Sequence, residues 1–137
     1  MNGFRAPHSL ALALLLGACG SPEYDHMTFE LRTHPPVPVT VTNSQITLPE
    51  GIAMLVKALP VSAGSEGYTA SDDMALTSGN EAVLGVREAD RITHVVLFGR
   101  SVGTACLQVE VNGKHEDCIS VRVVKNPGLS RSNDEEP

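Results

Sequence analysis

Apolar and polar residues alternate along much of the chain with a period of two, the spacing at which the side chains of a β-strand share one face. Residues 95–98 form a continuous apolar run, and residues 74–76 begin another short one. No helical periodicity of useful length interrupts this pattern, so the chain is predicted to be all-β. The alternating runs are Val37–Val41, Ile46–Leu48, Met54–Ala58, Ala105–Val111 and Ile119–Val123.

Turn residues separate these runs and indicate the fold class. Pro49-Glu50-Gly51 follows an early run, and Asn112-Gly113 joins the last two runs. Asn-Gly is a strong hairpin signal because both residues tolerate positive φ. The spacing predicts an immunoglobulin-like antiparallel β-sandwich of about seven strands, preceded by a signal peptide and a tether. The sandwich is expected over residues 37–125.

Residues 1–18 have the pattern of a secretory signal. Arg5 gives the start one positive charge, and Leu10–Leu16 is an apolar run too short for the roughly 20 residues that span a bilayer. The run ends in Leu16-Gly17-Ala18-Cys19, which resembles the lipobox of bacterial lipoproteins: an aliphatic residue, two small residues and a cysteine. An ordinary secretory signal and an uncleaved anchor are the alternatives.

The lipobox resemblance implies cleavage before Cys19 and acylation of its thiol, so that the lipid on Cys19 is the contact with a membrane. Several acyl chains on one residue hold a protein stably, at about 0.8 kcal/mol for each buried methylene. Gly20 and Ser21 follow the cysteine, where an aspartate would favour retention in the inner membrane. In a Gram-negative cell this resemblance implies the outer membrane more than the inner membrane.

Proline and acidic residues mark the segments on either side of the sandwich. Residues 19–36 are predicted to be the lipidated cysteine and a proline-rich tether, with a short strand over residues 27–31 as an alternative within it. Residues 126–137, rich in Pro, Ser and acids, are predicted to be a disordered tail because they offer little to bury.

Two registers are open for the hairpin at Asn112-Gly113. A two-residue loop turns Cys106 and Cys118 to opposite faces of the sheet. A three-residue loop pairs Glu110 with Lys114 and sets the two cysteines directly opposite each other. We expect the second register, and with it a disulfide that an exported protein can keep. Redox or metal chemistry is the rival interpretation, although the spacing of the pair matches neither a Cys-x-x-Cys motif nor a zinc knuckle.

Three stretches carry a family resemblance. Residues 46–58 hold a strand, a turn glycine and an alternating strand; residues 74–86 hold a strand, a Ser-rich turn and two spaced valines; residues 99–105 form a glycine-flanked turn. In this order they resemble the bacterial immunoglobulin-like domain, group 2. The resemblance implies a spacer, an adhesion module or a domain that contacts protein or carbohydrate, rather than an enzyme. The chain departs from the family at Leu76, where a tryptophan is usual, in its added cysteine pair and in a more charged segment over residues 87–93.

Charge limits the partners. The chain has 10 Lys and Arg against 16 Asp and Glu, a formal net charge of -6. Affinity for duplex nucleic acid rests largely on basic side chains, so no nucleic-acid partner is expected. No cofactor is expected either.

The polar residues that could carry chemistry fall into three groups: a hairpin tip, an acidic loop set and one histidine. For the first group a solvated tip is expected, because neighbours on a strand point to opposite faces. The second is either a calcium-binding cluster or ordinary surface acidity. The histidine is expected to be a capping or edge residue. The groups are His115, Glu116 and Asp117; Asp72, Asp73, Glu88 and Asp90; and His94.

The sequence therefore predicts a non-catalytic, lipid-anchored envelope protein that presents its sandwich to an envelope protein or glycan, as a structural, adhesion or binding module. No Gly-x-Ser-x-Gly elbow, phosphate loop, zinc-protease helix or EF-hand loop occurs in it. The alternative is a small periplasmic or surface hydrolase or metal-dependent enzyme. That alternative requires a pocket with convergent polar groups.

Overall fold

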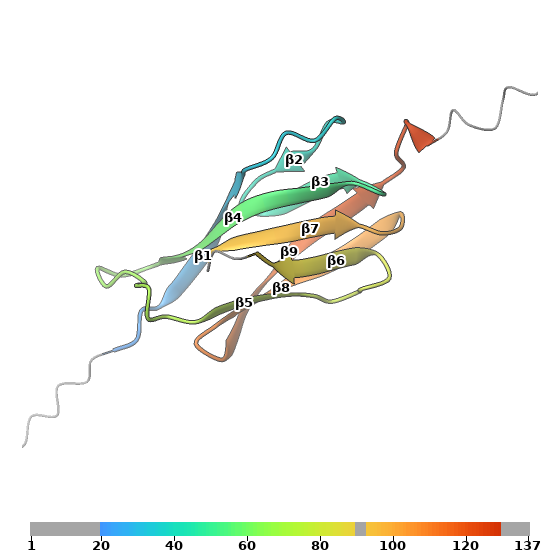
Figure 1. The fold of residues 1–137 in the computed structure, drawn as a ribbon. Helices are drawn as coiled ribbons and strands as arrows, with labels where there is room; N and C mark the ends of the chain where they lie inside the picture. The colour runs from blue at the N-terminus through green and yellow to red at the C-terminus, as the bar shows by residue number, and fades with distance from the viewer. Residues whose placement is uncertain (1–19, 90–92, 130–137) are drawn as a thin grey trace, which may run out of the picture.

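The computed structural model describes residues 20–89 and 93–129, which form nine β-strands and no α-helix (Figure 1). Nothing in these two ranges is a helix long and apolar enough to cross a membrane. The predicted signal peptide, Cys19 and residues 130–137 lie outside the described residues. The strands are β1 (Tyr24–Leu31), β2 (Thr40–Val41), β3 (Gln45–Pro49), β4 (Ala53–Ser62), β5 (Met74–Ser78), β6 (Leu84–Glu88), β7 (His94–Gly99), β8 (Gly103–Val111) and β9 (Lys114–Val124).

The strands form two sheets packed face to face. Sheet A has the order β1-β4-β7-β6, and sheet B has the order β2-β3-β9-β8-β5. With β2 and β3 set aside, this is the order of immunoglobulin-like sandwiches, in which the first, second, fifth and fourth strands face the third, sixth and seventh. The predicted fold class is confirmed, with two differences. The segment before β4 adds β2 and β3, and β3 pairs with β9 in parallel.

Aliphatic side chains fill the space between the sheets. The inward faces predicted from the alternation of β4, β8 and β9 are the buried ones. Leu76, which stands where the resembling family usually has tryptophan, faces this core from β5 and is 5% exposed. Each such leucine or valine stabilises the fold by about 1.5–3 kcal/mol through burial. The fully buried residues are Met27, Ile46, Leu48, Met54, Leu84, Leu97, Leu107, Val56, Val109, Val121 and Val123.

The predicted tether over residues 19–36 is too long. Residues 24–31 form β1, which pairs with β4 along its whole length. Met27 is fully buried, and Phe29 and Leu31 pack against the core from alternate positions. The period-two apolar pattern therefore outweighs the proline content around it, and this segment belongs to the sandwich.

The predicted three-residue hairpin loop is wrong. Asn112 and Gly113 form a two-residue loop with φ of 51° and 77°, and Val111 pairs with Lys114. Glu116 is then an extra residue, because Glu110 pairs with His115 and Val109 with Asp117. This bulge shifts the parity of β9 by one residue.

The bulge also decides how the two cysteines meet. Beyond it, Cys106 pairs with Ser120 and Cys118 with Gln108, so the cysteines are diagonal neighbours on the outer face of sheet B. Their Cα atoms are 5.4 Å apart, within the range of about 4.4–6.8 Å for disulfides. The predicted Cys106–Cys118 disulfide is present, although the direct pairing proposed for it is not.

The predicted disordered tail begins too early. After β9 the chain turns through residues 126–129, where the Asn126 side chain donates to the Glu50 carbonyl at 3.1 Å and accepts from the Gly128 N–H at 2.9 Å. Asn126 is 9% exposed. The described chain enters at one end of the sandwich and leaves at the other (Figure 1).

Candidate functional site

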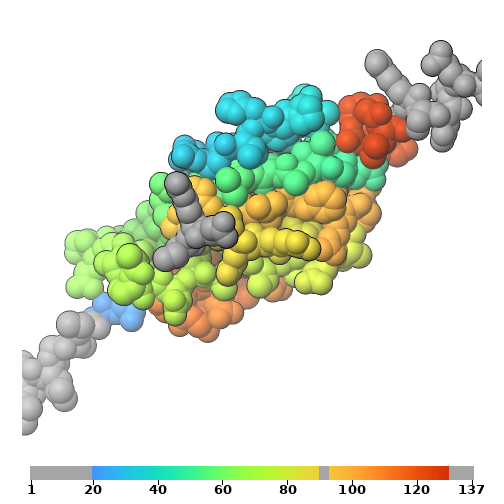
Figure 2. Space-filling model, viewed as in Figure 1, coloured from blue at the N-terminus to red at the C-terminus, as the bar shows by residue number. Residues whose placement is uncertain are grey.

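Two adjacent hollows open at the end of the sandwich where the described chain begins. They measure about 420 Å³ and about 440 Å³ and share Tyr68 and Val111, so we treat them as one feature, the Tyr68 cleft. In Figure 2 the connection between β4 and β5 lies at this end, beside the first described residues. The first hollow is lined by Leu59, Pro60, Tyr68, Thr69, Ala70, Asp72, Asp73, Met74, Thr93 and Val111. The second is lined by Ser21, Pro22, Glu23, Tyr24, Tyr68, Val111, Asn112, Lys114 and Glu116.

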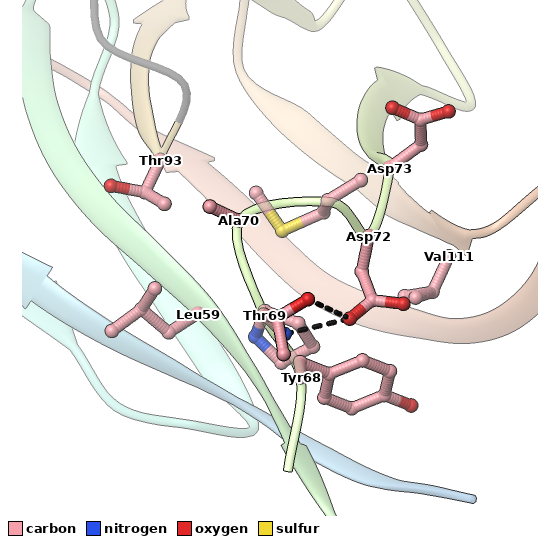
Figure 3. A pocket seen from close by; sticks show the side chains of 10 residues that line it. Leu59, Tyr68, Thr69, Ala70, Asp72, Asp73, Thr93 and Val111 are labelled. Atoms are coloured by element: carbon pink, nitrogen blue, oxygen red, sulfur yellow. Dashed lines mark hydrogen bonds between the residues drawn. The ribbon is translucent and has the colours of Figure 1, made fainter. Parts of the chain in front are cut away.

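Asp72 holds the β4–β5 connection in shape beside the first hollow (Figure 3). Its Oδ2 accepts hydrogen bonds from the N–H of Thr69 at 2.6 Å and from the Thr69 hydroxyl at 3.3 Å. Its Oδ1 accepts from Nδ2 of Asn112 at 2.9 Å. The Thr69 backbone bond, followed by the Asn112 bond, lowers the pKa of Asp72 below its ordinary value. Both carboxylate oxygens are therefore engaged in fixing the loop.

Asn112 links this loop to the tip of the β8–β9 hairpin. Its Oδ1 accepts from the N–H of Asp73 at 2.9 Å, and its own N–H donates to the Asp73 carbonyl at 2.8 Å. The Asn-Gly turn that reverses the chain thus also anchors the wall of the cleft. Its value as a turn signal was visible in the sequence, but its contact with a loop 39 residues away was not.

Two tyrosines are among the polar residues that line the cleft. The Tyr24 hydroxyl donates to Oδ2 of Asp117 at 2.8 Å. Burial raises the pKa of Tyr24 well above its usual range, and the bond to Asp117 raises it further. Burial also raises the pKa of Tyr68, followed by the nearby charges of Glu116 and Asp72. Both phenols stay neutral at physiological pH, so each keeps an O–H.

The structure separates the residues of the predicted hairpin-tip group. His115 is exposed, Glu116 is the bulge residue and lines the second hollow, and Asp117 bonds to Tyr24. A solvated tip thus describes His115 alone. Sequence reasoning missed Tyr24, Tyr68 and the role of Asp117, because only the packing of β1 against the hairpin bulge brings them together.

The acidic loop set does not gather around a cation site in the described residues. Asp72 and Asp73 are neighbours on the cleft wall, Glu88 ends β6, and Asp90 lies outside the described ranges. Among residues 20–89 and 93–129, no three His, Cys, Asp or Glu side chains lie close enough together to hold a metal ion. Both oxygens of Asp72 already accept hydrogen bonds, so this carboxylate suits a role in fixing the loop better than a role as a calcium ligand.

His94 is the first residue of β7. Its Nδ1 lies 3.4 Å from the hydroxyl of Thr93, which is one of the residues that line the first hollow. An activated hydroxyl sits closer to its base, at about 2.6–3.2 Å. The two residues are adjacent on the chain, and His94 lies at the start of β7, a central strand of sheet A with β4 on one side and β6 on the other.

The described residues define a class: an immunoglobulin-like β-sandwich with one disulfide and, at the end where the chain enters, a cleft with a mainly apolar first hollow and a mainly polar second hollow. No family model matches the sequence, and no curated protein matches it. Among solved structures, the chain is similar to the crystal structure of domains 4 and 5 of the S-layer protein SbsC, with 15% sequence identity and a TM-score of 0.46. The similarity covers 66% of this chain and 54% of that structure, so the chain spans about half of its length.

Proposed function

We propose that the chain is an exported, lipid-anchored, non-catalytic envelope protein that binds an envelope protein or glycan through the Tyr68 cleft. The observation that carries the proposal is the position of the cleft. Ser21, Pro22 and Glu23, which follow Cys19 closely in the sequence, line its second hollow. A lipid on Cys19 would therefore bring the anchor to the end of the molecule that holds the cleft.

The cysteine chemistry supports the anchor. The chain has 3 cysteines, and two of them, Cys106 and Cys118, form the disulfide. Disulfides persist in oxidising compartments outside the cytosol, which agrees with export. Cys19 is left as the one thiol to receive a lipid, at the position that the lipobox resemblance implies.

The start of β1 restricts how far the domain can stand from a membrane. Tyr24 opens β1 and is the fifth residue after Cys19, the residue proposed to carry the lipid. At about 3.6 Å per residue, this stretch reaches at most roughly 18 Å. The cleft would thus lie next to the headgroup layer, and the partner would be a molecule of the membrane-proximal envelope, at the outer membrane of a Gram-negative cell.

The lining of the cleft suits binding rather than bond-breaking. Apolar side chains such as Leu59, Pro60 and Met74 offer surface to an aliphatic or ring-shaped group. The neutral Tyr68 phenol offers an aromatic ring and an O–H beside them. Aromatic faces with a few fixed polar groups are typical of protein and glycan recognition.

Phase partition tests the anchor. The full-length protein made in a Gram-negative host should enter the detergent phase of a Triton X-114 extract, while the Cys19→Ser variant should stay in the aqueous phase. The same distribution for both proteins would contradict a lipid on Cys19.

Cross-linking in intact envelopes tests the cleft. A specific partner should be retained by the wild-type protein and by Val102→Ala, which shortens an exposed apolar side chain elsewhere, and should be lost with Tyr68→Ala. Loss of the partner in both variants, or no enrichment above the unanchored Cys19→Ser control, would count against recognition by the cleft.

A further inference from the structure

The outer face of sheet A carries another hollow, remote from the Tyr68 cleft. A hollow of about 300 Å³ opens there, lined by Ala53, Gly85, Arg87, Val96, Phe98 and Arg100. At one level of the sheet, Phe98 of β7 pairs with Ala53 on one side and with Gly85 on the other. Small neighbours on both sides leave the Phe98 ring uncovered, and it is 40% exposed.

Two arginines border this apolar surface. Gly85 has no side chain, and the Arg100 guanidinium occupies that space: its Nε lies 2.9 Å from where a Cβ on Gly85 would be. One Arg100 nitrogen also donates to the Glu81 carbonyl at 3.0 Å. Arg87 lies two residues after Gly85 on β6 and pairs with Val96 of β7.

The two guanidinium groups stand out against the charge of the chain. The formal net charge is -6, yet within the described residues neither Arg87 nor Arg100 has a carboxylate oxygen within 4.0 Å. Guanidinium groups bind carboxylates through planar, paired hydrogen bonds. An apolar surface between two such groups suits an acidic peptide segment.

The course of the chain after β9 indicates which acidic segment could bind in this hollow. The turn fixed by Asn126 brings Leu129 to the β3–β4 turn, where its Cδ1 lies 3.8 Å from the position of a Cβ on Gly51. The Gly51 N–H donates to the carbonyl of Gly99, the residue between Phe98 and Arg100, at 2.7 Å. Leu129, the last described residue, therefore lies near the end of sheet A at which the hollow opens.

We propose that the acidic segment Asn133-Asp134-Glu135-Glu136 of the same chain binds in this hollow and covers the outer face of sheet A. Its carboxylates pair with Arg87 and Arg100, and Pro137 supplies an apolar group for the Phe98 ring. The acids follow Leu129 by five to seven residues, a reach of up to roughly 25 Å at about 3.6 Å per residue. This inference is independent of the lipid anchor and of the Tyr68 cleft.

Arginine reactivity in the full-length protein tests the proposal. Asp134→Asn, Glu135→Gln and Glu136→Gln are introduced together, and the rate of phenylglyoxal modification at each arginine is read by mass spectrometry. Modification of Arg87 and Arg100 should be roughly two- to fivefold faster than in the wild type, the range expected for exposed ion pairs. Arg122, exposed on β9 of sheet B, serves as the internal control and should not change.

The other occupants give different results. Equal rates at Arg87 and Arg100 in both proteins would overturn the proposal. Protection of these arginines that grows with protein concentration would indicate a second copy instead, and would also overturn it. Protection that persists in the neutralised variant but disappears on purification from envelope extract would assign the hollow to an acidic partner and not to this segment.

Discussion

The Tyr24 hydroxyl of β1 donates a 2.8 Å hydrogen bond to Oδ2 of Asp117 in β9, and this bond joins sheet A to sheet B where the chain enters the domain. The two residues are 93 positions apart. Oδ1 of the same carboxylate accepts from the N–H of Cys118 at 2.7 Å. One aspartate therefore ties the first strand, the hairpin bulge and the disulfide together.

Tyr24→Phe should destabilise the domain by about 1–2 kcal/mol at neutral pH, because a hydrogen bond to a partly buried carboxylate is lost. The pKa of Tyr24 is raised in the folded state above its ordinary value of 10.0, so its contribution is present below pH 10 and is lost as pH rises beyond it. The difference between the two proteins in urea unfolding should therefore shrink above pH 10. Thr77→Val, which removes a hydroxyl that does not titrate in this range, is the control, and its difference from the wild type should not change above pH 10. A stability difference between the wild type and Tyr24→Phe that grows above pH 10 would contradict a raised pKa of Tyr24 in the folded state.

Loss of the disulfide should destabilise the domain by about 3 kcal/mol, since the bond closes a short loop with a sequence separation of 12 residues. The comparison is between the wild-type protein and Cys106→Ser/Cys118→Ser in urea unfolding. Cys19→Ser should leave the unfolding midpoint of the β-sandwich unchanged. A double variant as stable as the wild type would mean that the bond has no structural role.

Gly99→Ala should destabilise the domain by about 1–3 kcal/mol through overpacking. An added Cβ would lie 2.5 Å from the Pro49 carbonyl oxygen, a backbone atom held by β3. Gly64→Ala provides the control, because nothing lies within 4 Å of a Cβ there, and should change stability by no more than about 0.5 kcal/mol. Equal thermal midpoints for the two variants would contradict the close approach of β3 and β7.

Asn112→Ala should raise the pKa of Asp72 towards its ordinary value of 3.8, because one of its hydrogen bonds is lost. A lowered folded-state pKa means that the Asp72 contribution is present above 3.8 and is lost as pH falls through the lower folded value. Carbon-detected NMR titration measures this shift. Asn126→Ala, at the opposite end of the sandwich, should leave the Asp72 titration unchanged. An unchanged pKa of Asp72 in Asn112→Ala would contradict a stabilising hydrogen bond from Asn112 to this carboxylate.

Local patterns in the sequence identify most of the sandwich. The inward faces of β4, β8 and β9 follow from period-two alternation, and the cysteine pair follows from its place on the last two strands. The hairpin register could not be predicted, because two features set it. Asn112-Gly113 fixes a two-residue turn, and the bulge at Glu116 then shifts β9 by one residue, which brings Cys118 to the same face as Cys106. The turn signal is local, whereas the residue after the bulge, Asp117, bonds to Tyr24, a partner 93 positions away in the sequence.

The candidate site was less visible for the same reason. Tyr68 lies in a long connection without a strand pattern, and nothing near it in the sequence indicates a cavity. Asp72 resembled a calcium ligand by residue type alone. Its partner Asn112 lies on another hairpin, so its hydrogen bonds depend on the fold.

The lipid anchor and the disulfide are tested together by the intact mass of the full-length protein, expressed in a Gram-negative host and measured without reduction. The expected mass is that of a chain that begins at Cys19 with acyl chains attached, less two hydrogens for the Cys106–Cys118 disulfide. The mass of a chain that begins at Met1, or of one cut elsewhere with free thiols at Cys106 and Cys118, would contradict a lipid on Cys19.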